Sequence, residues 1–256
     1  MRWVRVRADS PEPPIVLARS DCGALWVQVM GAPVSLRPSG ALWIEAEGFL
    51  VAADLHLEKG SAFARGGQLL PPYDTLATLD RLEAEIAALA PRGLVLLGDS
   101  FHDPRALGRL HADDARRLAG LARGRDLIWI EGNHDVRGGE TVFAGLAGVS
   151  LPGEVVEILT VGPLLLRHEP LPGAQPGEVS GHLHPCAKVV AAGRGVRRRA
   201  FATDGQRLIL PAFGAYAGGL NLCDPAFANL FQGRPLAGAL GSNRVHPIPF
   251  SALCGD

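Results

Sequence analysis

The chain has 256 residues, 47% of them hydrophobic, and a formal net charge of −1. This near-neutral balance is not that of a protein that coats nucleic acid non-specifically. No apolar stretch reaches membrane-spanning length, and no signal peptide is evident, so we expect a cytoplasmic protein without a membrane partner. The four cysteines form no C-x-x-C pair, which argues against a zinc ribbon, and they predict free thiols. Length and hydrophobic content suit one domain over residues 1–256.

The sequence of the N-terminal part of the chain predicts short strands and a loop. Several prolines surround a strand-like run at Leu25–Met30. Two apolar runs, Ala41–Ala46 and Phe49–Ala53, flank Glu47-Gly48 and predict a β-hairpin. The segment Leu55–Pro72 reads as a long glycine-containing loop, a length that is often functional.

An alternation of helices and strands follows. Apolar residues at helical spacing predict an amphipathic helix over Thr75–Ala88, with Asp74 as its N-cap. An apolar strand at Leu94–Leu97, a helix over roughly Pro104–Leu121 and a strand at Leu127–Ile130 come next. This order predicts a parallel α/β sheet.

The second half of the chain reads as mainly β. Short strand-like runs with Gly/Pro turns between them follow residue 149: Val155–Thr160, Leu164–His168, Glu178–Gly181, Lys188–Ala192, Arg198–Ala202 and Arg207–Leu210. The predicted fold class is therefore α/β, as a four-layer α/β/β/α sandwich with a β-rich C-terminal half.

A series of oxygen and imidazole donors lies at the predicted strand ends. Ligand sites form outside the carboxyl ends of strands in open α/β sheets, so donors on several strands meet at one rim. Gly98, Gly132 and Gly181 precede donors, where a backbone without Cβ can turn sharply. In chain order the donors are Asp54, His56, Asp99, Asn133, His134, Asp135, His168, His182 and His184.

The donor chemistry points to a pair of transition metal ions. Carboxylate, amide and imidazole donors without thiolate suit Mn²⁺, Fe, Co²⁺ or Zn²⁺ better than a closed structural zinc site or a pure Mg²⁺ cage. Two adjacent metals usually serve phosphoester chemistry. His102, His111 and His246 lie outside the pattern and are set aside, because a lone histidine is usually a surface or core residue.

These motifs resemble those of the calcineurin-like metallophosphoesterases, whose pattern is D-x-H, G-D, G-N-H-[DE], a later H, and G-H-x-H. The segments Leu36–Trp43 and Leu210–Gly219 extend the resemblance to the bacterial ligase-associated DNA-damage-response phosphoesterases of the PdeM type. The resemblance then covers roughly residues 36–219, which implies a core there and peripheral extensions at 1–35 and 220–256. That branch implies a Mn²⁺-dependent DNA endonuclease, acting on single-stranded or flapped DNA and functionally associated with a DNA ligase and a helicase.

The resemblance also implies a role for each donor. Asp54, His56 and His184 hold one metal, Asn133, His168 and His182 hold the other, and Asp99 bridges them. His134 acts on the leaving group, with Asp135 orienting its ring. His168 is the least specific assignment, because its motif is a single residue.

The arginines Arg194, Arg197, Arg198 and Arg199 cluster around two glycines and are candidate substrate-binding residues. They fit a hairpin tip along a DNA backbone, or a solvated turn between strands. Two other functions stay open. One is a phosphoesterase of cyclic or dinucleotide substrates with the same site chemistry. The other is a non-catalytic metal-binding repair scaffold, which has no need of an acid at position 134. The sequence does not predict the oligomeric state.

Overall fold

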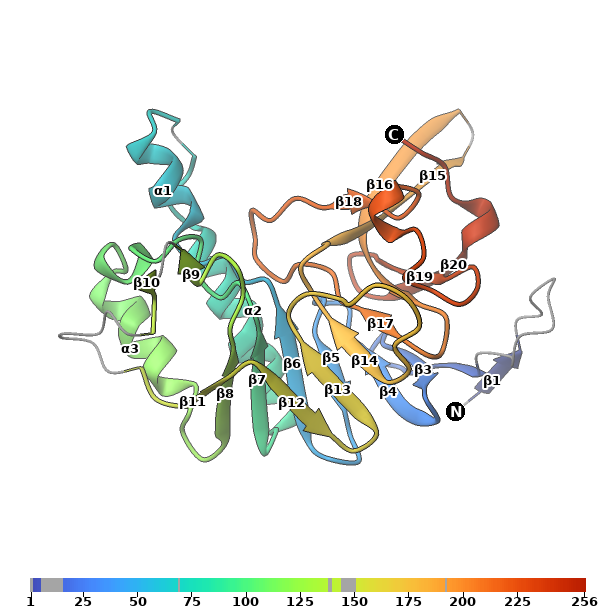
Figure 1. Cartoon of the computed structure of the whole chain (residues 1–256), viewed down its shortest axis with the longest axis horizontal. Coiled ribbons are helices and arrows are strands. Elements are labelled where there is room, and N and C mark those ends of the chain that lie inside the picture. Colours follow the sequence, from blue (N-terminus) through green and yellow to red (C-terminus); the bar gives the residue numbers. More distant parts are fainter. Residues whose placement is uncertain (1, 6–15, 69, 138–139, 144–150, 192) are drawn as a thin grey trace.

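The computed structural model describes residues 2–5, 16–68, 70–137, 140–143, 151–191 and 193–256, which form a mixed α/β structure with two mixed sheets (Figure 1). The first sheet has the order β1 (Arg2–Arg5), β2 (Val16–Arg19), β3 (Leu25–Val29), β4 (Ala32–Leu36), β5 (Leu42–Ile44), β6 (Phe49–Ala53), β7 (Gly93–Leu97), β8 (Asp126–Ile130) and β11 (Glu154–Val156). Neighbouring strands from β1 to β6 are antiparallel, and from β6 to β11 they are parallel.

The second sheet is built from the C-terminal half. Its order is β12 (Ile158–Val161), β13 (Leu164–Arg167), β14 (Glu178–Ser180), β17 (Leu208–Ile209), β16 (Arg194–Thr203), β15 (Pro185–Ala191) and β18 (Leu220–Asn221). Two further strands, β19 (Leu236–Leu240) and β20 (Val245–Pro249), extend it from β16. A separate small ribbon joins β9 (Val136–Arg137) and β10 (Glu140–Thr141).

The two sheets pack face to face. Buried Val51, Val95 and Ile128 of the first sheet share one hydrophobic cluster with Leu166 and Val179 of the second. Alternation along a strand puts every second side chain on this inner face. The fold therefore has its main core between two β layers, as the sequence predicts for the α/β class.

Helices cover the outer face of the first sheet. The helix α2 (Asp74–Leu89) buries Leu79 and Leu82 against Leu50 and Leu94, and α3 (Ala112–Gly120) adds Leu118 to the same cluster. Burial of leucines of this size contributes about 1.5–3 kcal/mol each. Among the described residues, no α-helix lies over the outer face of the second sheet. Short 3₁₀ turns η2 (Pro225–Phe227) and η3 (Phe250–Ala252) pack there instead of the predicted fourth helical layer.

The structure corrects several local predictions. The N-cap of α2 is Tyr73, because the Asp74 carboxylate accepts the Gly60 N–H at 3.0 Å and is not free to cap the helix. The predicted loop Leu55–Pro72 contains a seven-residue helix, α1 (Lys59–Arg65). The predicted helix over Pro104–Leu121 begins only at Ala112, after a 3₁₀ turn, η1 (Ala106–Gly108).

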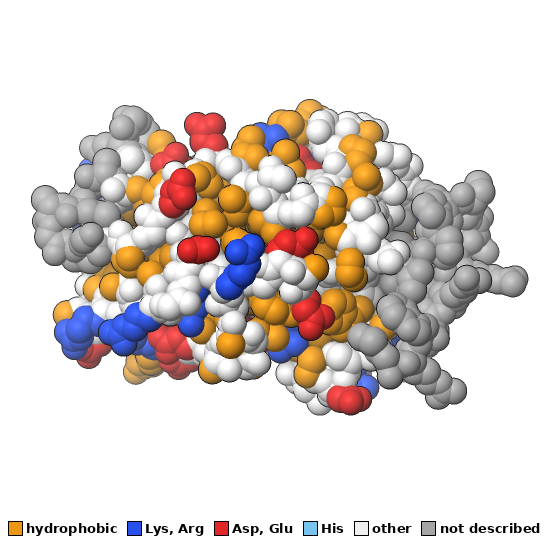
Figure 2. All heavy atoms as spheres, turned by 90° about the horizontal axis from the view of Figure 1, so that it is seen from below, with side chains coloured by type: hydrophobic (Ala, Val, Ile, Leu, Met, Phe, Trp, Pro, Cys, Tyr) orange, Lys and Arg blue, Asp and Glu red, His pale blue; other side chains and the backbone are white. Residues whose placement is uncertain are grey.

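Another correction concerns the predicted strand Val155–Thr160. It divides into β11, which joins the first sheet, and β12, which joins the second, so the chain crosses between the layers here. No described helix is long and apolar enough to cross a bilayer. The face seen from below in Figure 2 mixes acidic and basic side chains with hydrophobic ones. It lies at the end of the molecule opposite α1 (Figures 1 and 2).

Candidate metal centre

The first sheet delivers predicted donors from three adjacent parallel strands. Asp54 follows β6 directly, Asp99 comes two residues after β7, and Asn133 comes three residues after β8. The loops continue the parallel pairing, because Asp54 N–H donates to Gly98 O at 3.1 Å and His56 N–H donates to Asp99 O at 2.9 Å. The predicted rim at the carboxyl ends of strands is therefore present.

The second sheet delivers the remaining donors to the same place. His168 follows β13, while His182 and His184 lie between β14 and β15. The Gly181 N–H donates to the His168 carbonyl at 3.0 Å, which ties the two histidine loops together. The backbone N–H of His182 reaches both oxygens of Asp54, at 3.2 and 3.0 Å, and so joins the two sheets at the rim.

One group of potential ligands consists of Asp54, His56 and His184. The Nε2 atoms of the two histidines lie 3.3 Å apart, and His184 Nε2 lies 3.3 Å from Asp54 Oδ1. Burial lowers the pKa of His56 to about 2; the charge of Asp99 opposes this lowering, and the charge of His184 adds to it. A neutral imidazole is the form that binds a metal ion.

A second group contains Asp99, His168 and His182. His168 Nε2 lies 3.4 Å from Asp99 Oδ1 and 3.2 Å from His182 Nδ1. Asn133 belongs to this group as well, since its Oδ1 lies 3.0 Å from His168 Nε2. The structure thus brings His168, the least specific residue of the series, into the centre of this group.

Asp99 lies between the two groups. Its Oδ2 is 3.9 Å from His56 Nε2, and its Oδ1 faces His168. Burial opposes protonation of His168, but the hydrogen bond to Asp99 and the charge of Asp54 outweigh it and raise the pKa of His168 to about 9. Burial likewise works to raise the pKa of Asp99, and the contacts with His168 overcome it and lower that pKa to about 2. The buried carboxylates therefore attract positive charge.

The donor set fits a pair of metal ions. Asp54 and Asp99 are buried, and within the described residues their ion-pair partners are histidines alone. Buried carboxylates need a compensating cation. The Nε2 atoms of His56 and His184 face each other. When both carry lone pairs, they need a shared electron-pair acceptor, such as a metal ion. The two groups are therefore compatible with a binuclear metal site.

Backbone strain is concentrated at this rim. Five predicted donors have a positive φ: Asp54 (53°), His56 (44°), Asp99 (46°), His182 (66°) and His184 (47°). Such conformations cost about 1–3 kcal/mol each and persist where the surroundings enforce them. Residues that are kept in strained positions to bring their side chains together are a mark of a functional site.

Glycines allow the loops to approach closely. A Cβ on Gly98, which has φ of 72°, would lie 2.1 Å from Nδ1 of His168. A Cβ on Gly132 would lie 2.2 Å from the backbone N and from Oδ1 of Asp99. The motif glycines therefore do more than turn the chain, because they make room for donors from other loops.

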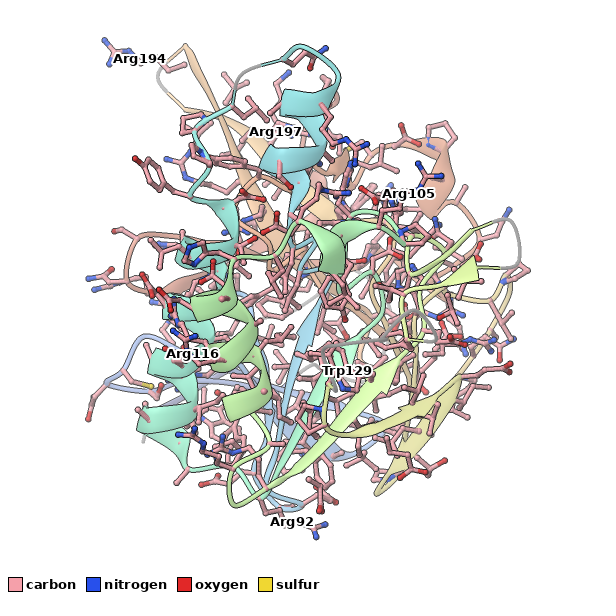
Figure 3. The ribbon with its side chains drawn as sticks, turned by 90° about the vertical axis from the view of Figure 1, so that its left-hand side faces the viewer. Arg92, Arg105, Arg116, Trp129, Arg194 and Arg197 are labelled. Carbon is pink, nitrogen blue, oxygen red and sulfur yellow. The ribbon has the colours of Figure 1, made fainter. Side chains whose placement is uncertain are left out.

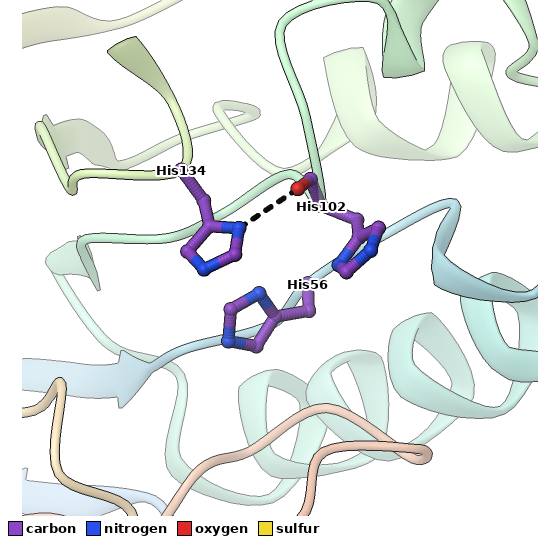
Figure 4. Close-up of side chains that lie close together, drawn as sticks. All are labelled: His56, His102 and His134. Atoms are coloured by element: carbon purple, nitrogen blue, oxygen red, sulfur yellow. Dashed lines mark hydrogen bonds between the residues drawn. The ribbon is translucent and has the colours of Figure 1, made fainter. Parts of the chain in front are cut away.

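His134 stands beside the first group, together with a histidine that sequence reasoning set aside. The centroid of its ring lies 5.0 Å from that of His56 and 5.6 Å from that of His102, on which it stacks (Figure 4). His134 Nδ1 lies 2.9 Å from the carbonyl oxygen of His102. These three histidines form a further cluster of donors. The other two histidines set aside lie elsewhere, with His111 capping α3 and His246 on β20.

Asp135 does not orient the ring of His134. Its fully buried carboxylate accepts backbone N–H bonds from Ser100 at 3.2 Å, Phe101 at 2.9 Å and Gly132 at 3.1 Å. Burial raises the pKa of Asp135 to about 7 against the opposing effect of these bonds. Asp135 therefore joins the loops that carry Asp99 and Asn133, while the carbonyl of His102 holds the ring.

The four candidate arginines lie on one hairpin, β15–β16, but on two faces of it. Successive side chains of a strand point to opposite faces, so Arg197 and Arg199 share one face and Arg194 and Arg198 the other. Arg198 lines a cavity of about 340 Å³ on its face. Arg194 lies near the tip and points away from the body of the protein (Figure 3). The four do not form one basic cluster.

The segment Pro211–Gly219 packs beside the first ligand loop. Phe213 N–H donates to Ala53 O at 2.7 Å, and Gly214 N–H donates to Asp54 O at 3.1 Å. The helix α1 projects from the same end of the molecule (Figure 1), and the ring of Phe63 lies 5.8 Å from that of His102. Both the Pro211–Gly219 segment and α1 therefore adjoin the donors.

Comparisons with known proteins give a clear relative among solved structures. No family model matches the chain, and no curated protein matches it. The crystal structure of Pseudomonas putida nuclease MPE is 30% identical, covers 88% of this chain and 100% of its own, and has a TM-score of 0.66. The E. coli phosphoesterase YfcE is more distant, at 18% identity and a TM-score of 0.40 over 80% of this chain and 99% of its own. The full-length match to nuclease MPE and the two donor groups agree, and the chain belongs to the PdeM-type metallophosphoesterase family.

Proposed function

We propose that the protein is a binuclear-metal-dependent phosphodiesterase that cleaves DNA, as an endonuclease acting on single-stranded or flapped regions. The observation that carries the proposal is the convergence of two donor groups on one rim, with His134 next to the first of them. The relationship to a nuclease over its full length supports nucleic acid as the substrate.

In this proposal Asp54, His56 and His184 would hold one metal, and Asn133, His168 and His182 would hold the other. Asp99, which faces both groups, would supply a ligand to each. Mn²⁺ is the proposed metal, since oxygen and imidazole donors without thiolate suit it, and Fe, Zn²⁺ and Co²⁺ are the alternatives. A bound pair of cations would supply Lewis-acid chemistry, making water more acidic and offsetting negative charge on the phosphoryl group.

The proposed role of His134 follows from what holds its ring. A carbonyl oxygen only accepts, so the contact with His102 keeps a proton on Nδ1 of His134. In the imidazolium form Nε2 also carries a proton. His134 can then donate the Nε2 proton to the oxygen that leaves the phosphorus, as general acids do.

Asp135 contributes to this reaction indirectly. It fixes the backbone of Ser100, Phe101 and Gly132, and so the spacing between the loops of Asp99 and Asn133. Buried carboxylates that accept several backbone N–H bonds hold loops with little freedom, and this preorganises the donors.

A screen of metals and substrates tests the proposal. Purified protein with Mn²⁺ is expected to nick circular single-stranded DNA, and the His134→Ala and Asp99→Ala variants are expected to lose that activity. His111→Ala, at the exposed histidine that caps α3, is the matched control and should retain it. Duplex DNA, RNA and a small phosphodiester complete the screen.

The same screen separates the alternatives. Rapid turnover of a small phosphodiester without DNA cleavage under any divalent metal would favour a phosphoesterase of cyclic or dinucleotide substrates. Equal inactivity of the wild-type and His134→Ala proteins on every phosphoester would favour a metal-binding repair scaffold. A role in DNA repair beside a DNA ligase and a helicase is part of the proposal. Neighbouring genes for a ligase and a helicase would support it.

A further inference from the structure

The two faces of the hairpin β15–β16 carry different side chains, and one of them is called the basic face below. The register pairs Lys188 with Arg197 and Cys186 with Arg199, so Lys188, Arg197 and Arg199 lie on one face. The opposite face carries Val189 and Val196, which line the cavity that Arg198 also lines. The basic face turns toward the Pro211–Gly219 segment, because Arg197 Nη2 donates to Gly219 O and Arg199 Nη1 to Ala212 O.

The two outer cations of this face already converge on one anion. The Asp256 carboxylate lies 3.8 Å from Lys188 Nζ and 3.4 Å from Arg197 Nε, through the same oxygen, Oδ1. Its side chain is 57% exposed, so solvent screens the contact and a stronger anion can displace it. The spacing of Lys188 and Arg197 therefore suits one small anionic group.

The inner part of the face reaches the metal-centre rim. Arg199 Nη1 donates to the carbonyl oxygens of Ala212 at 2.8 Å and Gly214 at 3.1 Å, and Gly214 N–H in turn donates to Asp54 O. Arg81 of α2 joins from the other side, with its guanidinium 4.5 Å from the centre of the Phe213 ring and a hydrogen bond to Phe213 O. Arg199 thus lies two hydrogen bonds from a predicted metal ligand.

Arg81 and Arg199 lack the carboxylate partner that several other arginines have. Arg37, Arg109, Arg117 and Arg207 each form an ion pair with a carboxylate. Within the described residues, the ion pairs include no carboxylate partner for Arg81 or Arg199, whose recorded hydrogen bonds go to carbonyl oxygens.

Their charges also interact. Both guanidinium groups bind carbonyl oxygens of the same segment, Arg81 that of Phe213 and Arg199 those of Ala212 and Gly214. Burial and then the charge of Arg199 lower the pKa of Arg81 to about 10. An anion bound near the two groups would offset their mutual repulsion.

We propose that Lys188, Arg197, Arg199 and Arg81 form a phosphate-binding track that holds one side of a single-stranded nucleic acid next to the metal centre. The inference rests on the proposed nuclease function and adds the path of the strand: from the scissile phosphate at Asp54, past Arg199 and Arg81, to the Lys188–Arg197 pair. Guanidinium groups bind phosphate oxygens through paired donors, and unpaired cations gain most from such contacts.

The opposite face of the same strand provides a matched control. Lys188→Gln/Arg197→Gln removes two charges from the track, whereas Arg194→Gln/Arg198→Gln removes two charges from the other face. Both are compared in a His134→Ala background loaded with Mn²⁺, which prevents cleavage. Binding of fluorescein-labelled oligothymidylate is measured by anisotropy over a series of NaCl concentrations.

The track variant is expected to bind about tenfold more weakly, and the slope of log K against log salt should fall by about 1.4, because each phosphate contact contributes about 0.7 on a single strand. The control variant should stay within about twofold of the parent. A single Arg199→Gln should lower the slope by about 0.7, and Arg199→Lys should restore it, since lysine keeps the charge.

The outcomes separate the track from the proposed function. Equal weakening by the two double variants, or weakening by neither, overturns the track even if the wild-type protein cleaves the oligonucleotide. If the track variant binds the oligonucleotide more weakly than the control variant, but the wild-type protein does not cleave it, only the nuclease proposal is overturned. Absence of both binding and cleavage overturns both.

Discussion

The two halves of the chain contribute different chemistry to the same rim. The first sheet supplies the buried carboxylates Asp54 and Asp99, whereas the second supplies imidazoles and, on its hairpin, exposed cations such as Arg197. Each donor group mixes the two. His184 from the second sheet meets Asp54 and His56, and His168 meets Asp99.

This division has a structural consequence. Both buried carboxylates come from the first sheet, whereas the second sheet, which carries the proposed substrate track, contributes only imidazole donors. Neither half holds a complete donor group, so docking of the two sheets through their shared core assembles the site.

Removing the charge of Asp99, which faces both donor groups, should have the largest effect on turnover. Asp99→Asn is expected to lower phosphodiester turnover by on the order of 10³-fold or more, since it weakens both metal positions at once. Turnover and bound metal per chain are measured together. Asp103→Asn, in the same loop but paired with Arg109, is the control. Normal metal content and activity in Asp99→Asn would show that the first sheet does not supply the central ligand.

Removing an imidazole from the second sheet should have a smaller effect. His168→Ala is expected to lower turnover about 10²-fold and to leave one bound metal of two, because the donors of the first group stay intact. Elemental analysis of the purified variant checks the stoichiometry, with His246→Ala on β20 as the control. Retention of both metals would remove His168 from the ligand set.

Metal removal tests whether the ions also hold the two sheets together. Each ion present at about 100 times its Kd stabilises the folded state by about 2.7 kcal/mol, so chelation should lower the Tm by about 10 °C. Thermal unfolding of wild-type and Asp99→Asn proteins, with and without Mn²⁺, measures this. If the variant gained as much from Mn²⁺ as the wild type, the ions would be binding elsewhere.

Much of the first half can be predicted from the sequence, because its strands are short, fully apolar and followed by donors. The runs at Phe49–Ala53, Leu94–Leu97 and Leu127–Ile130 correspond to β6, β7 and β8. The helix α1 escapes prediction, since Gly60 inside it and Gly66 after it weaken its helical signal. Gly60 is needed there, because a Cβ would lie 2.6 Å from Asp74 Oδ1.

In the site, motifs predict which side chains meet but not what the backbone does. The three N–H donors to Asp135 and the carbonyl that holds His134 leave no signal in side-chain identity. His102 belongs to no motif, and only its place three residues after Asp99 could have marked it. The division of the four arginines between two faces is not predicted, because the predicted strand begins at Arg198. The observed strand β16 begins at Arg194, so alternation along it places the four arginines on two faces.

The smallest expected effect is a change in oligonucleotide affinity at the cations of the second sheet. The Asp256 carboxylate neutralises Lys188 and Arg197, and it would compete with a phosphate for them. Asp256→Asn is therefore expected to raise the affinity for oligothymidylate about twofold at low salt, with no gain at high salt, because exposed ion pairs contribute about 0–1 kcal/mol and are screened. Asp113→Asn, an exposed acid paired with Arg116 on α3, makes the same change in net charge away from the hairpin. If both variants bind the oligonucleotide equally more tightly, net charge alone accounts for the gain, and the second sheet then offers the strand no defined anion position at Lys188 and Arg197.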